Sequence, residues 1–237
     1  KDGKIISMGT DLPGSPEFIE VDASGKWITP GIIDIHSHMG VYSAPSVSSS
    51  SDGNESTSPI TADVWAEHSI WTQDPQFALA LKGGVTTFHV LPGSANLIGG
   101  RGVTAKNLQR NTINSMKFPN APHTLKMACG ENPKRVYGNR KQAPSTRMGN
   151  IAGYRKAWIE AESYLSRLDE YESKSDEAKE IGYKPKRDLE LETLAGVLRG
   201  EILVHNHCYR AGEMAMMIDV AKEFNYKITA FHHAVEA

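Results

Sequence analysis

Short apolar runs alternate with segments of helical periodicity along most of the chain, and this alternation limits the fold more than any other feature. Strands are predicted over residues 32–35, 85–91, 125–128, 201–205 and 227–232. Helices are predicted over residues 75–82, 150–172, 188–199 and 211–224. Strands that alternate with helices are typical of a parallel sheet with helical crossovers. We therefore expect an α/β fold.

The alternation begins only after residue 27, and this suggests two domains. Residues 1–27 contain the alternating stretches KIISM and EFIEV, joined by Gly and Pro turns, and predict a small β element. Residues 28–237 would form the second, larger domain. Within it, residues 43–59 are rich in serine and too polar to pack, which predicts a mobile loop.

Composition excludes several classes of partner. The 237 residues carry a formal net charge of −2, which gives no electrostatic reason to expect nucleic acid or an anionic membrane. No apolar run approaches the roughly 20 residues needed to cross a bilayer. Two cysteines, Cys129 and Cys208, are too few and too distant to suggest a disulfide scaffold. No signal peptide is visible, which favours a cytoplasmic over a secreted protein. A small-molecule substrate is the expected partner, and self-association stays open.

The candidate chemistry lies at the ends of the predicted strands. Side chains that can bind a metal follow four of the apolar runs: His36 and His38, Glu131, His205 or His207, and His232 or His233. The carboxyl ends of parallel barrel strands meet on one face, where residues far apart in sequence can share a cation.

The pair His36 and His38 is the most informative of these sites. Residues two apart on a strand point to the same side, so both imidazoles can reach one ion. Imidazole and carboxylate ligands suit zinc and similar divalent metals. A single such pair could equally be two surface or hydrogen-bonded core histidines; four strand-end sites in order make coincidence much less probable.

Several segments carry a resemblance to a known family. The stretch TPGIIDIHSHMG (29–40) resembles the first-strand signature of the amidohydrolase superfamily, and DGKII with VDASGKWI before it is similar to the lead-in of that family's N-terminal β-sandwich. The stretches GGVTTFHVLPGSANLIGG (83–100), KMACGENPKRVYG (126–138) and PSTRMG (144–149) resemble the imidazolonepropionase-like branch. The resemblance implies a TIM-like (β/α)₈ barrel with a small N-terminal β-sandwich element. It also implies one or two divalent metal ions, zinc first among them, and hydrolysis of C–N bonds by water.

The resemblance also implies a ligand set. His36 and His38 match the first-strand ligands, and Glu131 resembles the glutamate ligand of amino-sugar deacetylases in the superfamily. Other members use a carboxylated lysine, for which Lys126 is the alternative and Lys106 a weaker one.

Two further ligands come from paired histidines. His205 matches the fifth-strand ligand better than His207, and His233 matches the sixth-strand ligand better than His232. The resemblance then leaves His207 and His232 to contact substrate.

Two arginines are further candidates for substrate binding. Arg101, in SANLIGGRG, could assist Gly backbone amides in holding an anion, although a tight turn that requires Gly explains the segment as well. Arg147, in PSTRMG, could hold a substrate carboxylate or phosphate in a bidentate manner, and a structural ion pair is the equal alternative.

One position of the family pattern has no counterpart. The aspartate that follows the eighth strand, and acts there as general base, is not found in the 237 residues, so the sequence predicts a barrel incomplete at its C-terminus. The first hypothesis is a metal-dependent hydrolase of an amide or cyclic amide of a small molecule. The alternatives are an amino-sugar deacetylase or dipeptidase of the same superfamily, or a metal-binding barrel remnant without activity.

Overall fold

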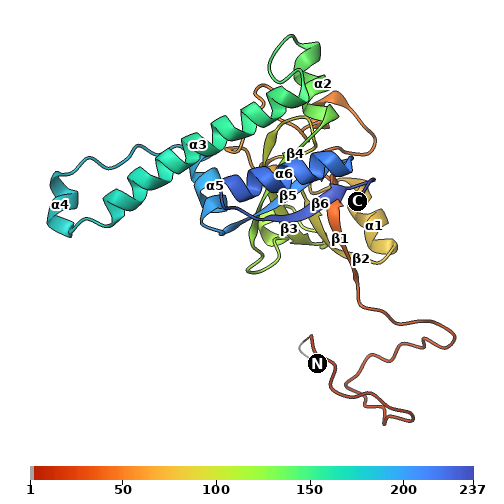
Figure 1. The fold of residues 1–237 in the computed structure, drawn as a ribbon. Coiled ribbons are helices and arrows are strands. Elements are labelled where there is room, and N and C mark those ends of the chain that lie inside the picture. The colour runs from red at the N-terminus through yellow and green to blue at the C-terminus, as the bar shows by residue number, and fades with distance from the viewer. Residues whose placement is uncertain (1–2) are drawn as a thin grey trace. The chain divides into compact units, whose positions relative to one another are not determined.

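Six strands form one sheet in the order β1-β2-β3-β4-β5-β6. The computed structural model describes residues 3–237, and Figure 1 shows the strands with the helices around them. The strands are β1 (Ile32–Ser37), β2 (Val85–Val90), β3 (Ile98–Lys106), β4 (His123–Ala128), β5 (Ile202–Cys208) and β6 (Ile228–His233). The helices are α1 (Pro75–Lys82), α2 (Glu131–Asn139), α3 (Arg147–Glu172), α4 (Asp176–Ile181), α5 (Leu189–Leu198) and α6 (Ala211–Glu223). Short 3₁₀ turns cover Ser48–Ser50, Ala66–His68 and Ile113–Ser115.

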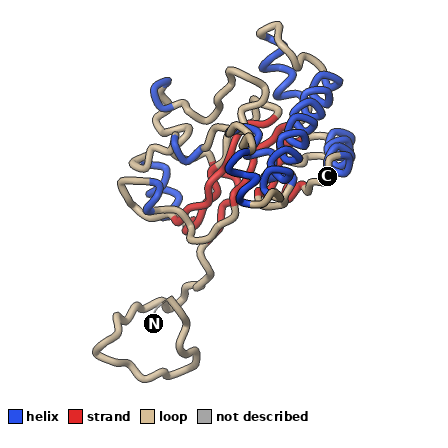
Figure 2. The backbone as a smooth tube through the Cα atoms, turned by 90° about the vertical axis from the view of Figure 1, so that its left-hand side faces the viewer, coloured by secondary structure: helices blue, strands red, loops and turns tan. Residues whose placement is uncertain are grey.

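The sheet curls until its two outer strands approach each other. The Nδ1 atoms of His36 at the end of β1 and His232 at the end of β6 lie 2.9 Å apart. Helices flank the strands in Figure 2. The arrangement is a nearly closed barrel of six strands with helices around it. The alternation predicted its α/β class, and the resemblance implied a barrel that is incomplete.

One strand corrects the expectation of a parallel sheet. β3 is antiparallel to both β2 and β4, so β1, β2, β4, β5 and β6 all run the same way. β3 lies in the Gly-rich segment that the sequence favoured as a turn or anion cradle. Gly102 suits this strand because a Cβ there would lie 2.6 Å from Thr124 Oγ1 and 2.8 Å from His89 Nε2. Only glycine lets these neighbouring strands approach so closely.

Apolar packing holds the helices on the strands. One buried cluster joins α3, α5 and α6 to the strands, with Trp158 and Leu125 fully buried in it. A second cluster holds α1 through the rings of Phe77 and Phe88, whose centroids are 5.1 Å apart. In the part of the chain that the structure describes, no helix is long and apolar enough to cross a membrane.

The Ser-rich segment is fastened to the β2–β3 connection. Asn96 is buried, and its Nδ2 donates to the backbone oxygens of Glu55 at 2.6 Å and Ser58 at 2.8 Å. Asn54 in turn donates from Nδ2 to Asn96 Oδ1 at 3.2 Å. These bonds place the segment beside the carboxyl ends of the strands.

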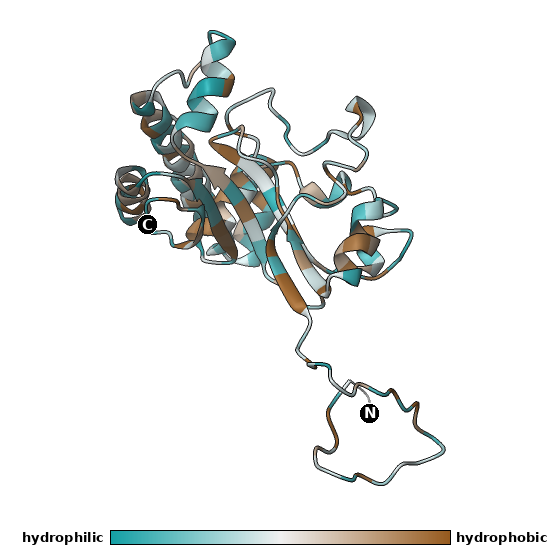
Figure 3. Cartoon of the chain, turned by 90° about the vertical axis from the view of Figure 1, so that its right-hand side faces the viewer, coloured by the Kyte–Doolittle hydropathy of each residue, from teal (hydrophilic) through white to brown (hydrophobic). Residues whose placement is uncertain are grey.

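The N-terminal segment forms a separate unit, Lys1–Pro30, apart from Gly31–Ala237. Its described residues, 3–30, contain no strand or helix, so the predicted β element is not seen there; residues 1 and 2 lie outside the described part. Ile19 and Trp27 are almost fully exposed. Alternating apolar residues form a strand only where another strand supplies backbone partners, and no strand of the described part of the chain pairs with residues 3–30. Figure 3 shows apolar colouring at the start of β1, where Ile32 and Ile33 are largely exposed.

This difference predicts a contrast in hydrogen exchange within the 237-residue chain. Backbone amides of residues 3–30 should exchange at nearly the rate of an unfolded chain. Amides of Phe88 and Val90, fully buried on β2, should exchange at least about a thousandfold more slowly, because their opening approaches global unfolding. Hydrogen exchange followed by mass spectrometry measures both rates, and equal protection of the two regions would contradict the absence of strands in residues 3–30.

Candidate active site

Seven of the nine histidines gather around the carboxyl ends of the five strands that run the same way. One lies on β1 and a second directly follows that strand. β2 carries one, and β5 and β6 carry two each. They are His36, His38, His89, His205, His207, His232 and His233. The sequence predicted this convergence of side chains from strand ends.

Four of these rings form a continuous chain of contacts. His36 Nε2 lies 3.3 Å from His38 Nε2, and His36 Nδ1 lies 2.9 Å from His232 Nδ1. His232 Nε2 lies 2.8 Å from His205 Nδ1. The other nitrogen of His38, Nδ1, lies 2.8 Å from the backbone oxygen of Leu91 and can donate to it. A metal-binding imidazole typically donates its second N–H to such an acceptor.

Lys126 of β4 lies among these histidines and is buried. Its Nζ donates to the backbone oxygen of Pro92 at 2.8 Å. Burial lowers the pKa of Lys126 to about 7. Burial, together with the positive charge of Lys126, also lowers the pKa of each of the seven histidines, and for His36 and His232 to about 3. The imidazoles are therefore neutral at neutral pH, which is the form that binds metals.

The histidine nitrogens are suitable ligands for a divalent metal, and two of them are also spaced as ligands of one ion. Two nitrogens bound to one tetrahedral zinc ion lie about 3.3 Å apart, and the Nε2 atoms of His36 and His38 are separated by this distance. Within residues 3–237, however, no three His, Cys, Asp or Glu side chains already form a metal-binding group. His36 and His38 are thus arranged as two ligands of one ion, whereas the remaining rings are hydrogen-bonded to one another.

The structure places the two pairs of histidines differently. His205, which the sequence preferred as a ligand, belongs to the chain of rings. On β6, the buried His232 contacts both His36 and His205, whereas His233 is exposed, has a φ of 67° and lies with its ring 4.5 Å from that of His207. Adjacent residues at a strand end point to opposite sides, so a one-residue uncertainty in the alignment exchanges their positions.

Glu131 lies apart from the ring chain. It is the first residue of α2 and is exposed. Among the described residues, no hydrogen bond or ion pair joins it to a histidine. Lys126, the alternative considered from the sequence, occupies the central position instead.

The two arginines predicted to bind substrate are engaged elsewhere. Arg101 Nε donates to Thr193 Oγ1 of α5 at 2.9 Å, and its guanidinium lies 4.4 Å from the centre of the Trp65 ring. Arg147 Nε donates to Glu213 Oε1 of α6 at 2.5 Å. The first contact joins β3 to α5, and the second joins α3 to α6. Arg147 thus makes the kind of structural ion pair that the sequence left as its alternative.

The Arg147–Glu213 pair should matter for stability. The Glu213 side chain is 7% exposed, so Arg147→Met would leave a nearly buried carboxylate without its cation. We expect this substitution to lower the free energy of unfolding by about 2 kcal/mol. Arg155→Met is the matched control: Arg155 pairs with Glu223 on exposed surface, and its loss should cost less than about 1 kcal/mol. Urea unfolding of both variants measures the difference, and equal costs would show that Glu213 does not depend on Arg147.

Three features of the site were missed or underrated in the sequence. Cys129 and Cys208 form a disulfide that links the ends of β4 and β5, with their Cα atoms 5.2 Å apart. His89 is a core residue with both ring nitrogens 3.0 Å from threonine hydroxyls, yet its ring also lies 4.9 Å from that of His205. Asn132 lies 3.1 Å from His207 through its Nδ2 atom. Asn132 was missed because it lies in the first turn of α2, a helix that the sequence did not predict.

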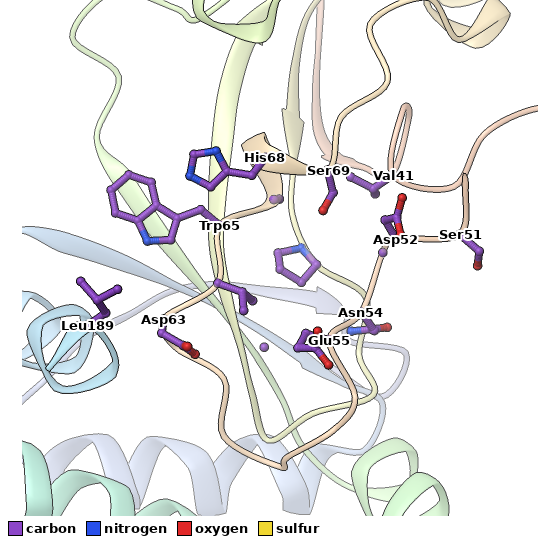
Figure 4. A pocket seen from close by; sticks show the side chains of 15 residues that line it. Val41, Ser51, Asp52, Asn54, Glu55, Asp63, Trp65, His68, Ser69 and Leu189 are labelled. Atoms are coloured by element: carbon purple, nitrogen blue, oxygen red, sulfur yellow. The ribbon is translucent and has the colours of Figure 1, made fainter. Parts of the chain in front are cut away.

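Two hollows open near the histidines. The larger, about 580 Å³, is formed mainly by the β1–α1 connection. Figure 4 shows the carboxylates of Asp52, Glu55 and Asp63 around it, with the rings of Trp65 and His68 at one side. The smaller, about 350 Å³, is lined by histidines of the cluster and by residues of α2. A small molecule therefore has access to the histidines from the side of α2.

Comparisons with known proteins agree with this architecture. No family model matches the chain. Amidohydrolase tasK of Hapsidospora irregularis is 37% identical over 253 aligned positions, which cover 99% of this chain and 25% of that protein. An imidazolonepropionase of Geobacillus sp. (strain WCH70) is 46% identical over 46 residues, 16% of this chain and 11% of that protein.

A solved structure extends the agreement to the fold. The crystal structure of an amidohydrolase from Thermotoga maritima MSB8 superposes with a TM-score of 0.88 and 36% identity, over 98% of this chain and 58% of that one. The chain thus spans a quarter of the length of tasK and somewhat over half of the Thermotoga maritima protein. With the His-x-His pair at the end of β1 and the shared barrel, these similarities establish that the chain belongs to the amidohydrolase superfamily.

Proposed function

We propose that this chain carries the metal centre of a hydrolase that cleaves a C–N bond, in an amide or cyclic amide, of a small molecule. The observation that carries the proposal is the convergence of neutral imidazoles from β1, β5 and β6 on one end of the barrel. The His36–His38 nitrogen separation supports it further, since two ligands of one ion are already at the required spacing. The superfamily of the chain makes zinc the first candidate, as one or two ions.

His36, His38, His205 and one residue of the pair His232 and His233 would hold the metal. When bound there, the ion would supply an activated water molecule and polarise the scissile carbonyl. The protein's own part is to keep the imidazoles neutral through burial and to fix their orientation. The hydrogen bond from its Nδ1 to the backbone oxygen of Leu91 orients His38. This bond leaves the lone pair of Nε2 to bind the ion.

Lys126 is proposed as the further ligand in place of Glu131. Its amine would add to carbon dioxide, forming an N–C bond and releasing a proton, and the resulting carbamate would offer two oxygens. Its position among the histidines supports this role, and so does its contact with Pro92, which fixes the end of the side chain. Glu131, exposed at the start of α2, would have to turn inward to compete.

A cyclic amide is favoured among the substrates because of the short match to an imidazolonepropionase. An amino-sugar deacetylase or dipeptidase remains the alternative within the superfamily, since the same histidines would serve it. The histidine cluster would serve each of these substrates equally. The shape and charge of the hollows beside it would therefore determine which substrate binds.

The test is a substrate screen with the full-length, zinc-loaded protein. We expect hydrolysis of at least one amide or cyclic amide, its loss on removal of zinc by a chelator, and its return on adding zinc back. Hydrolysis that persists without metal would refute the proposal. Tight zinc binding without hydrolysis of any compound would instead support the inactive metal-binding alternative.

A further inference from the structure

We propose that the smaller hollow binds a carboxylate group of the substrate, with Arg135 as its charge partner. The inference takes one point from the proposed function, namely that the bond to be cleaved lies at the histidines. The hollow is bordered by His38, His207 and His233 on the cluster side and by Asn132 and Arg135 of α2 on the other. A molecule held there would touch both the guanidinium and the candidate metal ligands.

Arg135 is the source of positive charge in this hollow. Among the described residues that line it, Arg135 is the one side chain with a permanent charge. Its Nη2 atom makes a 3.4 Å contact with Asn132 Oδ1, and within residues 3–237 no salt bridge involves it. Glu131 lies four residues earlier, at the usual spacing of a helical ion pair, yet no such pair is formed. An exposed guanidinium without a counter-charge, directed to a hollow beside a candidate reaction site, is suited to a bidentate carboxylate.

A second residue that lines the hollow, His207, has a ring nitrogen without a hydrogen-bond partner. Asn132 accepts from Arg135 through Oδ1, so its Nδ2 is the donor that faces Ser94 Oγ at 2.8 Å and His207 Nε2 at 3.1 Å. His207 Nε2 therefore accepts, and the proton of the neutral ring lies on Nδ1. This Nδ1 is buried and has no hydrogen-bond partner, in a side chain that is 1% exposed. A buried N–H without an acceptor is costly, so an acceptor oxygen that reached Nδ1 would stabilise the ring.

The charges of the two hollows favour the same assignment. The larger hollow is bordered by Asp52, Glu55 and Asp63, which would repel an anion. The smaller hollow has Arg135 and no carboxylate among its described lining residues. Its volume of about 350 Å³ is also at the lower end of the range for small-molecule sites. The substrate class that fits is a small amide or cyclic amide that bears a carboxylate.

The test compares matched pairs of probes by calorimetry on the full-length, zinc-loaded protein. N-acetylglycine, N-acetylalanine and N-acetylleucine are each compared with their neutral carboxamides. We expect at least one carboxylate to bind about 10-fold more tightly than its carboxamide, as a charge-assisted hydrogen bond would give. Arg135→Gln should remove this preference and Arg135→Lys should retain part of it. Arg135 is exposed, so neither change should affect folding.

The control is Lys134→Gln, which removes the same charge from the neighbouring position of α2 but does not border the hollow. It should leave the carboxylate preference unchanged. A preference that survives Arg135→Gln would show that the carboxylate binds elsewhere, for example on the metal, and would overturn the inference; so would the absence of any preference. Because the carboxylate preference is a ratio of binding affinities, a failed hydrolysis screen with an Arg135-dependent preference would reject the proposed function alone.

Discussion

Replacement of His36 by alanine is expected to weaken zinc binding by at least about 100-fold, because one of roughly four ligands that together supply 10–16 kcal/mol would be lost. His36 is the ring that joins β1 to β6, through contacts with both His38 and His232. Its loss should therefore also reduce the thermal stabilisation that zinc gives to the chain, since a metal that binds the native state stabilises it by mass action. Competition with a chromophoric chelator measures the affinity, and thermal unfolding with and without zinc measures the stabilisation.

The matched control is His123→Asn. His123 is also a strand histidine, but it is exposed at the first position of β4, at the opposite end of the strand from Ala128. Zinc affinity and zinc-induced stabilisation should be unchanged in this variant. Equal effects of the two substitutions would mean that zinc binds to surface histidines rather than to the cluster.

Lys126→Met is expected to reduce hydrolysis by at least about 100-fold, the upper end of the effect seen for groups that only support metal ligands. Methionine fills a similar volume in this buried position but cannot form a carbamate. Protein incubated with ¹³C-labelled bicarbonate should show a carbamate carbon in its NMR spectrum, and Lys126→Met should lack it. The signal and the activity should be lost together.

Lys106 provides the control for this experiment. It was the weaker lysine candidate in the sequence, and in the structure it is exposed, with its Nζ 5.3 Å from the centre of the Phe118 ring. Lys106→Met should keep both the carbamate signal and the activity. Full hydrolysis by Lys126→Met without a carbamate signal would restore Glu131 as the candidate for this position.

The main outline of the site could be predicted from the sequence because strand ends in a parallel barrel converge. The spacing of His36 and His38 fixed their common side, and the order of the apolar runs placed His205 and the pair on β6 near them. The antiparallel β3 could not be predicted in the same way, since its glycines are as typical of a turn as of a closely packed strand. The predicted N-terminal β element is not seen in residues 3–30 for a different reason: alternation shows what a segment can form, whereas pairing depends on which partner is present.

The details within the site depended on contacts that the sequence does not encode locally. Arg147 has the same appearance in the sequence whether it meets a substrate or Glu213, which lies 66 residues away. Lys126 was underrated because it lies within β4 rather than after it. His232 and His233 are adjacent, so the choice between them required the exact end of β6.

The central claim, that the histidines at the ends of β1, β5 and β6 hold a metal ion, is tested most directly by a zinc-loaded crystal. Diffraction data collected on both sides of the zinc absorption edge would locate the ion without reference to the protein coordinates. We predict an anomalous peak about 2.0–2.1 Å from Nε2 of both His36 and His38, with a nitrogen of His205 among the other ligands. A fully loaded crystal with its zinc peak away from His36 and His38 would contradict the claim.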